Sequence, residues 1–163
     1  MRRNKSFLKL FALLVLLAAV WGPLAVGAAE RQQDVLNGTS WRLNQLARAD
    51  GALAPIPDGA EVTIAFADGT ASGSGGCNRF RVGYRAEGTS LITWTGPIVA
   101  TMMACEPDLQ ALERDFFATL ERVVGFENAM GVLTLADAGE MPVAVFREVV
   151  PLPLTGTTWS ATM

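Results

Sequence analysis

Much of the chain alternates apolar and polar residues with a period of two, which is typical of β-strands that bury one face. In residues 61–73, Val62 and Phe66 belong to such a run, and Asp68-Gly69 follows it directly. Because Asp-Gly is typical of tight two-residue hairpin turns, this stretch predicts a β-hairpin. Similar patterns in residues 38–47, 80–105 and 125–148 predict further short strands, about seven or eight in all.

The strand expected over residues 79–85 has two faces of different chemistry. One face comprises Phe80, Val82 and Tyr84, and the other comprises Arg79, Arg81 and Arg85. Arginine forks bind carboxylates well, so the cationic face is a candidate surface for binding a partner. Alternatively, these arginines form local ion pairs with Asp or Glu on a solvated strand face.

One segment has the spacing of a helix. Its apolar residues recur three or four positions apart: Leu109, Leu112, Phe116, Leu120 and Val123. This stripe, with a proline suited to the first turn, predicts a single helix from about Pro107 to Val123. The combination predicts an α+β domain, in which a curved or barrel-like antiparallel sheet is closed on one side by a packed helix.

The N-terminus has the three parts of a secretory signal peptide. Basic residues precede the apolar run "LFALLVLLAAV", and small residues follow it. We expect residues 1–28 to form a signal peptide that is cleaved after Ala28, or alternatively after Ala29. The apolar run is shorter than the ~20 residues of a membrane span, and no cysteine follows it for lipidation. A periplasmic or secreted protein without a membrane anchor is therefore expected.

Removal of the leader changes the charge of the chain. The leader contains Arg2, Arg3, Lys5 and Lys9, so its loss takes the formal net charge from −3 to −7. Phosphate backbones and anionic membranes attract basic proteins, so neither nucleic acid nor an anionic membrane surface is an expected partner.

The C-terminal residues 149–163 are expected to form a linker and a possible first strand of a second, truncated repeat. "LTGTTW" at 154–159 resembles "LNGTSW" at 36–41, and it follows the proline-rich "VVPLPL". The alternative is a coincidental match in a closing strand.

The residues that could carry catalysis or bind a metal are few. The chain has no histidine and only two cysteines, which excludes the usual Ser-His-Asp and Cys-His mechanisms and the usual zinc sites. No catalytic residue, metal or cofactor is therefore predicted. An even number of cysteines in an exported chain favours a disulfide, which would stabilise the fold by roughly 3–4 kcal/mol. A nucleophilic Cys77 near Arg79, or a phosphate-binding loop of the neighbouring glycines, remains an alternative.

These motifs together resemble the META domain family of HslJ-like proteins. The similarity lies in "NGTSW", "GGCNRFRVGY" and "TMMAC", followed by the expected helix, and it extends over residues 36–148. The resemblance implies a mixed fold of antiparallel strands with a packed helix, and a disulfide between Cys77 and Cys105. It also implies an association with heat or envelope stress, and it implies no catalytic residues.

Three functions remain open. The leading hypothesis is an exported, non-enzymatic module that supports envelope stress tolerance or binds an envelope or secreted protein through Arg79, Arg81 and Arg85. The second is a small-molecule-binding module that uses the interior of the sheet, lined by Phe80, Tyr84 and Trp94. The third, less favoured, is an enzyme with a free Cys77 as its nucleophile or redox centre.

Overall fold

A computed structural model describes residues 34–150, so the expected signal peptide and the expected second repeat at 154–159 lie outside the described residues. The strands and the helix of this part are β1 (Thr39–Ala47), β2 (Leu53–Pro55), β3 (Val62–Ala67), β4 (Thr70–Gly75), β5 (Arg79–Glu87), β6 (Leu91–Trp94), β7 (Val99–Ala100), α2 (Pro107–Leu120), β8 (Val123–Ala129), β9 (Val132–Asp137) and β10 (Pro142–Glu148). None of the helices in this part of the chain is long and apolar enough to span a membrane.

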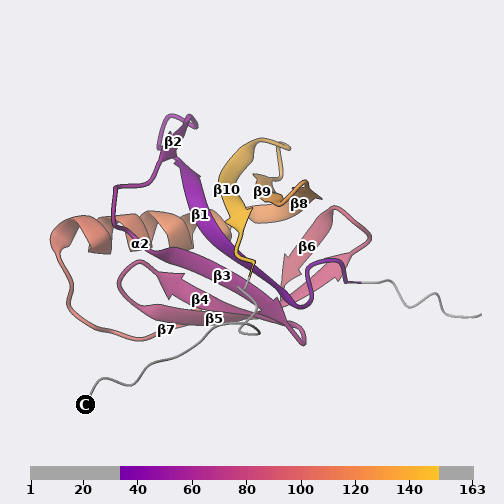
Figure 1. Ribbon diagram of the computed structural model, residues 1–163, viewed down its shortest axis with the longest axis horizontal. Coiled ribbons are helices and arrows are strands. Elements are labelled where there is room, and N and C mark those ends of the chain that lie inside the picture. The colour runs from indigo at the N-terminus through magenta and orange to yellow at the C-terminus, as the bar shows by residue number, and fades with distance from the viewer. Residues whose placement is uncertain (1–33, 151–163) are drawn as a thin grey trace, which may run out of the picture. The chain divides into compact units, whose positions relative to one another are not determined.

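The strands form a closed antiparallel barrel (Figure 1). The order around it is β1, β3, β4, β5, β6, β8, β9 and β10, and β10 pairs with β1 to close the circle. The short strands β2 and β7 pair with β1 and β5 outside this circle. The seam between β6 and β8 is the shortest pairing of the circle, because only Leu91 and Gly125 lie opposite each other there. The expected α+β fold with a barrel-like sheet is confirmed.

The β3–β4 hairpin turns at the predicted pair. Asp68 and Gly69 both have positive φ, at 49° and 73°, as the favoured two-residue hairpin turn requires. The turn sets the register in which Phe66 lies opposite Ala71, and both side chains are buried. The alternation of the sequence thus decides which face of the hairpin enters the barrel.

The interior of the barrel is packed with side chains from all around the circle. Trp41 of β1, Phe66 of β3 and Phe146 of β10 are among its largest fully buried residues. From the helix, Phe116 reaches this core, and its ring lies 5.6 Å from that of Phe80 and 6.3 Å from that of Phe146. The edge-to-face arrangement of these pairs is the favoured one for buried aromatic rings.

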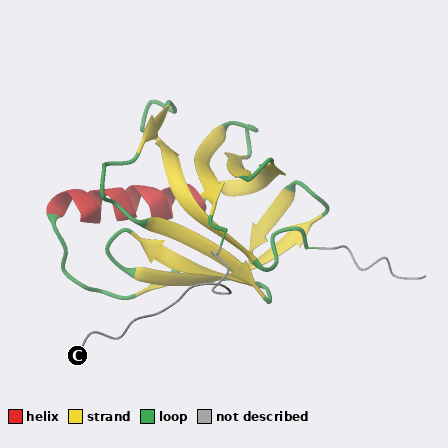
Figure 2. Ribbon diagram, in the orientation of Figure 1, coloured by secondary structure: helices red, strands yellow, loops and turns green. Residues whose placement is uncertain are grey.

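The helix α2, red in Figure 2, packs against the barrel through the predicted apolar stripe. Pro107 occupies its first turn, and Phe116 and Leu120 are fully buried. The helix ends at Leu120, earlier than expected, because the chain turns at residues 121–122 and continues into β8. Val123 keeps the helical spacing and is buried, but it reaches the core from the first position of a strand.

Candidate functional site

A disulfide joins Cys77, in the loop between β4 and β5, to Cys105 just before α2. The two Cα atoms are 5.9 Å apart and the sequence separation is 28. Cys77 is buried and only 9% exposed. This is the pair that the family resemblance implies, and in the described residues no cysteine is free. A thiol nucleophile at Cys77 therefore has no support in this structure.

Asn78, the residue after Cys77, is the centre of a buried hydrogen-bond network. Its side-chain oxygen accepts hydrogen bonds from the Thr101 hydroxyl at 2.8 Å and the Met103 backbone N–H at 2.7 Å. Its backbone N–H donates to Oε2 of Glu113 at 2.6 Å, and its side-chain N–H donates to Oε1 at 2.8 Å. One asparagine therefore links the loop after β4, the loop before α2 and the helix itself.

A glycine lets the helix approach this network. A Cβ on Gly75 would lie 2.7 Å from Oε2 of Glu113 and 2.9 Å from Cζ of Phe117, closer than carbon atoms normally come. Only a residue without a side chain fits there unless the side chains of Glu113 and Phe117 move. The "GGCN" motif thus has a structural explanation, and a phosphate-binding role is not needed to account for it.

Of the three aromatic residues proposed to line a ligand cavity, Phe80 and Tyr84 belong to the core, and Trp94 is partly buried against it. Phe80 is buried against the rings of the helix, and Tyr84 is buried with its ring centroid 4.9 Å from that of Phe66. The Tyr84 hydroxyl donates to Oδ2 of Asp34 at 2.6 Å, and the Trp94 indole N–H donates to the Leu120 carbonyl at 2.6 Å. These contacts favour a packing role over a ligand-binding one.

The predicted arginine row lies on the outer face of the barrel. Arg79, Arg81 and Arg85 are all exposed, and they alternate along β5 with buried Phe80, Val82 and Tyr84. Among residues 34–150, Arg42 and Glu61 form an ion pair. None of the three arginines of β5 forms one with a carboxylate in this part of the chain. The alternative of local ion pairs is not what the structure shows for these residues.

The pairing register continues this row into neighbouring strands. Arg79 lies opposite Ser74 of β4, Ser74 opposite Thr63 of β3, and Thr63 opposite Arg42 of β1. Arg42 in turn lies opposite Arg147 of β10. Directly paired residues point to the same face of an antiparallel sheet, so Arg79 on β5 shares the barrel's outer face with Arg42 on β1 and Arg147 on β10.

A concavity of about 650 Å³ lies on this face, over β1, β3, β4 and β5, and we name it the outer-face groove. Arg79 lines it, whereas Arg42, Arg81 and Arg147 lie beyond its lining residues. Its floor carries small side chains, namely Ser40, Thr63, Ala65, Ser72 and Ser74. Arg79 and Glu61 also line it, with Met103 and Val149. Arg85 lies further along β5, where it pairs with Thr93 of β6, and so falls outside the groove.

Arg42, Arg147, Asn78 and Glu113 did not emerge as candidates from the sequence. The sequence signal for Glu113 is its position beside Leu112 on the apolar side of the helix. A carboxylate is seldom buried there unless it has a partner. Arg42 follows buried Trp41, just as Arg81 follows buried Phe80, so the alternation predicts that Arg42 is exposed. Only the strand register shows that Arg42 lies opposite Thr63. In residues 34–150, no group of three or more acidic or cysteine side chains is placed to hold a metal.

The family to which the chain is related follows from its sequence. The model of the META domain matches residues 34–150, the whole of the part described here. The chain belongs to the META domain family. No curated protein matches it.

Solved structures resemble this META domain as well. An NMR structure of a protein from Burkholderia xenovorans is 26% identical with a TM-score of 0.57, over 71% of this chain and 85% of that one. A crystal structure of a duf4847 family protein from Bacteroides vulgatus is 18% identical with a TM-score of 0.49, over 69% of this chain and 94% of that one. The first of these supports the fold.

Proposed function

We propose that this META domain is an exported, non-catalytic module that binds a partner protein of the cell envelope or the extracellular space and thereby supports stress tolerance. Two features of the molecule support a module without catalysis. The core is filled by aromatic side chains, and both cysteines are joined in a disulfide. A disulfide is also the expected state in an oxidising, exported compartment.

The observation that carries the proposal is the exposed arginine row of β5. Three guanidinium groups at Arg79, Arg81 and Arg85 stand on one strand face, on a chain whose formal net charge is −3. Arginine is favoured at interfaces because its planar fork can form two parallel hydrogen bonds to a carboxylate. An acidic protein that concentrates such groups on one face is suited to an acidic partner surface.

The other two functions have less support. A small-molecule module would need space beside Phe80, Tyr84 and Trp94, whose side chains are committed to core contacts and hydrogen bonds. A cysteine-dependent enzyme would need a free thiolate at Cys77, which the disulfide removes.

Export is tested by the intact mass of the protein recovered from the producing cells, alkylated with and without prior reduction. We expect the mass of a chain that begins after Ala28, and alkylation only after reduction. A full-length mass, or alkylation of Cys77 without reduction, would contradict the export and the disulfide, respectively.

Partner binding is tested by capture of envelope proteins on the immobilised mature chain. A triple variant, with Arg79, Arg81 and Arg85 replaced by Gln, should lose its captured partner. A matched variant removes the same charge from three exposed arginines elsewhere: Arg48, Arg114 and Arg122. It should retain the partner. Equal capture by both triple variants and the unmodified chain would reject the arginine row as the binding surface.

A further inference from the structure

We infer that the outer-face groove holds an extended acidic segment of a partner protein, with two carboxylate side chains four residues apart. This inference rests on the proposed function, because it specifies where on the β5 side of the barrel the partner binds and what its bound segment looks like.

Two cross-strand rows define the groove. The first runs from Arg42 through Thr63 and Ser74 to Arg79. The second is parallel to it and runs through Ser40, Ala65, Ser72 and Arg81. Each row has small side chains in the middle and an arginine at the β5 side, where Arg79 lines the groove and Arg81 lies next to its lining residue Ser72. The small side chains form a floor that an extended backbone could approach closely.

Beyond the β1 side of the groove, two arginines form an unfavourable arrangement in the free protein. Arg42 and Arg147 lie directly opposite each other in paired strands, and like charges in this position destabilise a sheet. Glu61 forms an ion pair with Arg42. Within the described residues Arg147 has no such partner, so a carboxylate bound at this side would relieve the repulsion.

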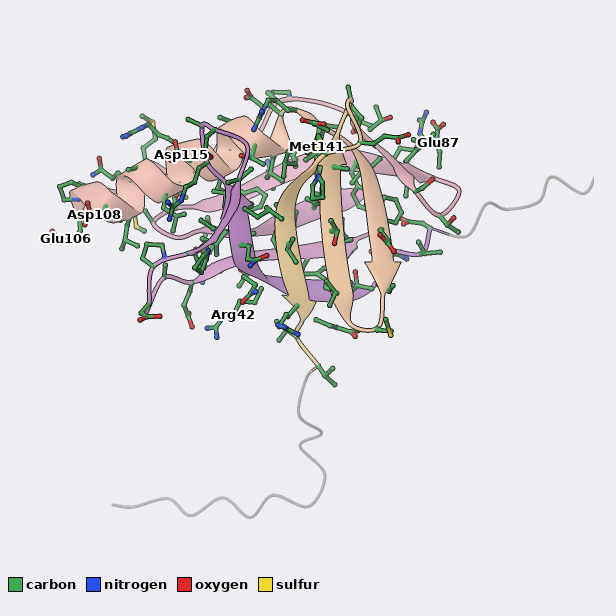
Figure 3. The ribbon with its side chains drawn as sticks, turned by 90° about the horizontal axis from the view of Figure 1, so that it is seen from above. Arg42, Glu87, Glu106, Asp108, Asp115 and Met141 are labelled. Carbon is green, nitrogen blue, oxygen red and sulfur yellow. A yellow bond between two sulfur atoms is a disulfide. The ribbon has the colours of Figure 1, made fainter. Side chains whose placement is uncertain are left out.

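Charge is separated between this face and the helix. In Figure 3, Asp108 and Asp115 lie on α2 and Glu106 just before it, in the upper left of the view, whereas Arg42 lies below the barrel. The exposed charged residues from 106 to 122 are four acids and two arginines, so this side is net acidic and an acidic partner would favour the groove side.

The dimensions of the groove specify the ligand. Paired strands are about 4.8 Å apart, so the three spacings from β1 to β5 separate Arg42 and Arg79 by about 14 Å. An extended chain advances 3.3–3.6 Å per residue at most, so about four residues span this distance. Residues four apart in an extended chain also point to the same side. Acidic residues at positions i and i+4, with small residues between them, therefore match the two arginine sides.

The experiment uses the mature chain, labelled with ¹⁵N, and a synthetic probe peptide. The probe is Gly-Gly-Glu-Ala-Ser-Ala-Glu-Gly-Gly, and a control peptide carries Gln in place of both glutamates. We expect the probe to shift amide signals of Thr63 and Ser74, which lie between Arg42 and Arg79, with a dissociation constant below about 1 mM. The control peptide should cause no such shifts.

Variants of exposed residues then locate the contacts. Replacing Arg79 or Arg147 by Gln should each weaken binding about fivefold, as loss of one charge-assisted contact at a partly exposed site does. Glu61→Gln should strengthen binding about threefold, because it releases Arg42 from its internal partner. Arg114→Gln is the control, because this exposed arginine of α2 does not line the groove, and it should leave affinity unchanged.

Other results would overturn the inference. Absence of binding, equal binding of the Gln peptide, or shifts centred on Arg85 and Thr93 would each reject the groove as the site. Sodium sulfate with the same shifts and affinity as the probe would indicate a site for a single anion. If the peptide does not bind the groove but the triple variant of β5 still loses partner capture, the inference about the groove is wrong and the proposed function is retained. If capture is unaffected, the proposed function fails on its own test.

Discussion

The clearest energetic prediction concerns the carboxylate of Glu113. This side chain is only 9% exposed and accepts hydrogen bonds on both oxygens, from the backbone and the side chain of Asn78. Glu113→Gln keeps the shape of the side chain, so it creates no cavity. It replaces one acceptor with an NH₂ group that must face a donor of Asn78, and it removes the charge from the remaining hydrogen bond.

The size of the effect follows from these contacts. Hydrogen bonds to a charged group contribute about 1.5–3 kcal/mol, and a buried donor without an acceptor costs about 1–3 kcal/mol. We therefore expect Glu113→Gln to lower the free energy of unfolding by about 3 kcal/mol, and Tm by about 10 °C. Since folded domains are stable by only about 5–15 kcal/mol, this is a large part of the total.

The assay is urea unfolding of the mature chain, followed by tryptophan fluorescence and circular dichroism. The matched control is Glu106→Gln, because Glu106 precedes the same helix, is exposed and makes no capping hydrogen bond through its side chain. It should change stability by less than about 0.5 kcal/mol. Equal midpoints and equal m-values for the two variants would show that the buried network contributes no net stability, and would refute the reasoning.

Three further predictions follow from neighbouring features. Reduction of the disulfide should lower the free energy of unfolding by about 3–4 kcal/mol, measured by urea unfolding with and without a reductant. Gly75→Ala, whose Cβ would meet the helix, should destabilise by about 1–3 kcal/mol, whereas Gly96→Ala should be neutral because nothing lies within 4 Å of its Cβ. Burial and then the hydrogen bond to Asp34 raise the pKa of Tyr84 above its ordinary value of 10.0. Stability from this group should therefore be constant below about pH 10 and fall above it, and Tyr84→Phe should remove that fall in a pH series of thermal melts.

Each of these has a result that would contradict it. Unchanged stability on reduction would mean that the network around Asn78 constrains the loops without the disulfide. Equal stability of the two glycine variants would mean that the helix moves away from β4 at little cost. An alkaline loss of stability that persists in Tyr84→Phe would assign the titration to other groups.

The fold was predictable because its signals are local. The alternation along residues 61–73 and the Asp68-Gly69 pair specify a hairpin before any long-range contact is known. The helical stripe is equally local, and only its end was misplaced, since Val123 keeps the spacing while it belongs to β8. The short strand β2 lacks the alternation that would reveal it, and it exists only because β1 offers an edge.

The groove was not predictable because it depends on register between distant segments. Sequence alone identifies Arg79 and Arg81 as exposed cations on one strand. That Arg147 lies opposite Arg42 depends on the closure of the barrel by β1 and β10, which are separated by most of the domain. Similarly, nothing local indicates that the carboxylate of Glu113 meets Asn78.

The stabilising network and the candidate binding surface are adjacent, and this couples them. The Arg79 backbone N–H donates to the Thr101 hydroxyl at 3.2 Å, and the Arg79 carbonyl accepts from the Thr101 N–H at 3.0 Å. The same hydroxyl donates to Asn78, and Cys77 and Met103 lie at the margin of the groove. The disulfide and Asn78 therefore hold the strand position from which Arg79 projects. Because binding by a positioned side chain costs less entropy than binding by a mobile one, reduction should weaken the groove's affinity for an acidic peptide even at temperatures where the domain stays folded.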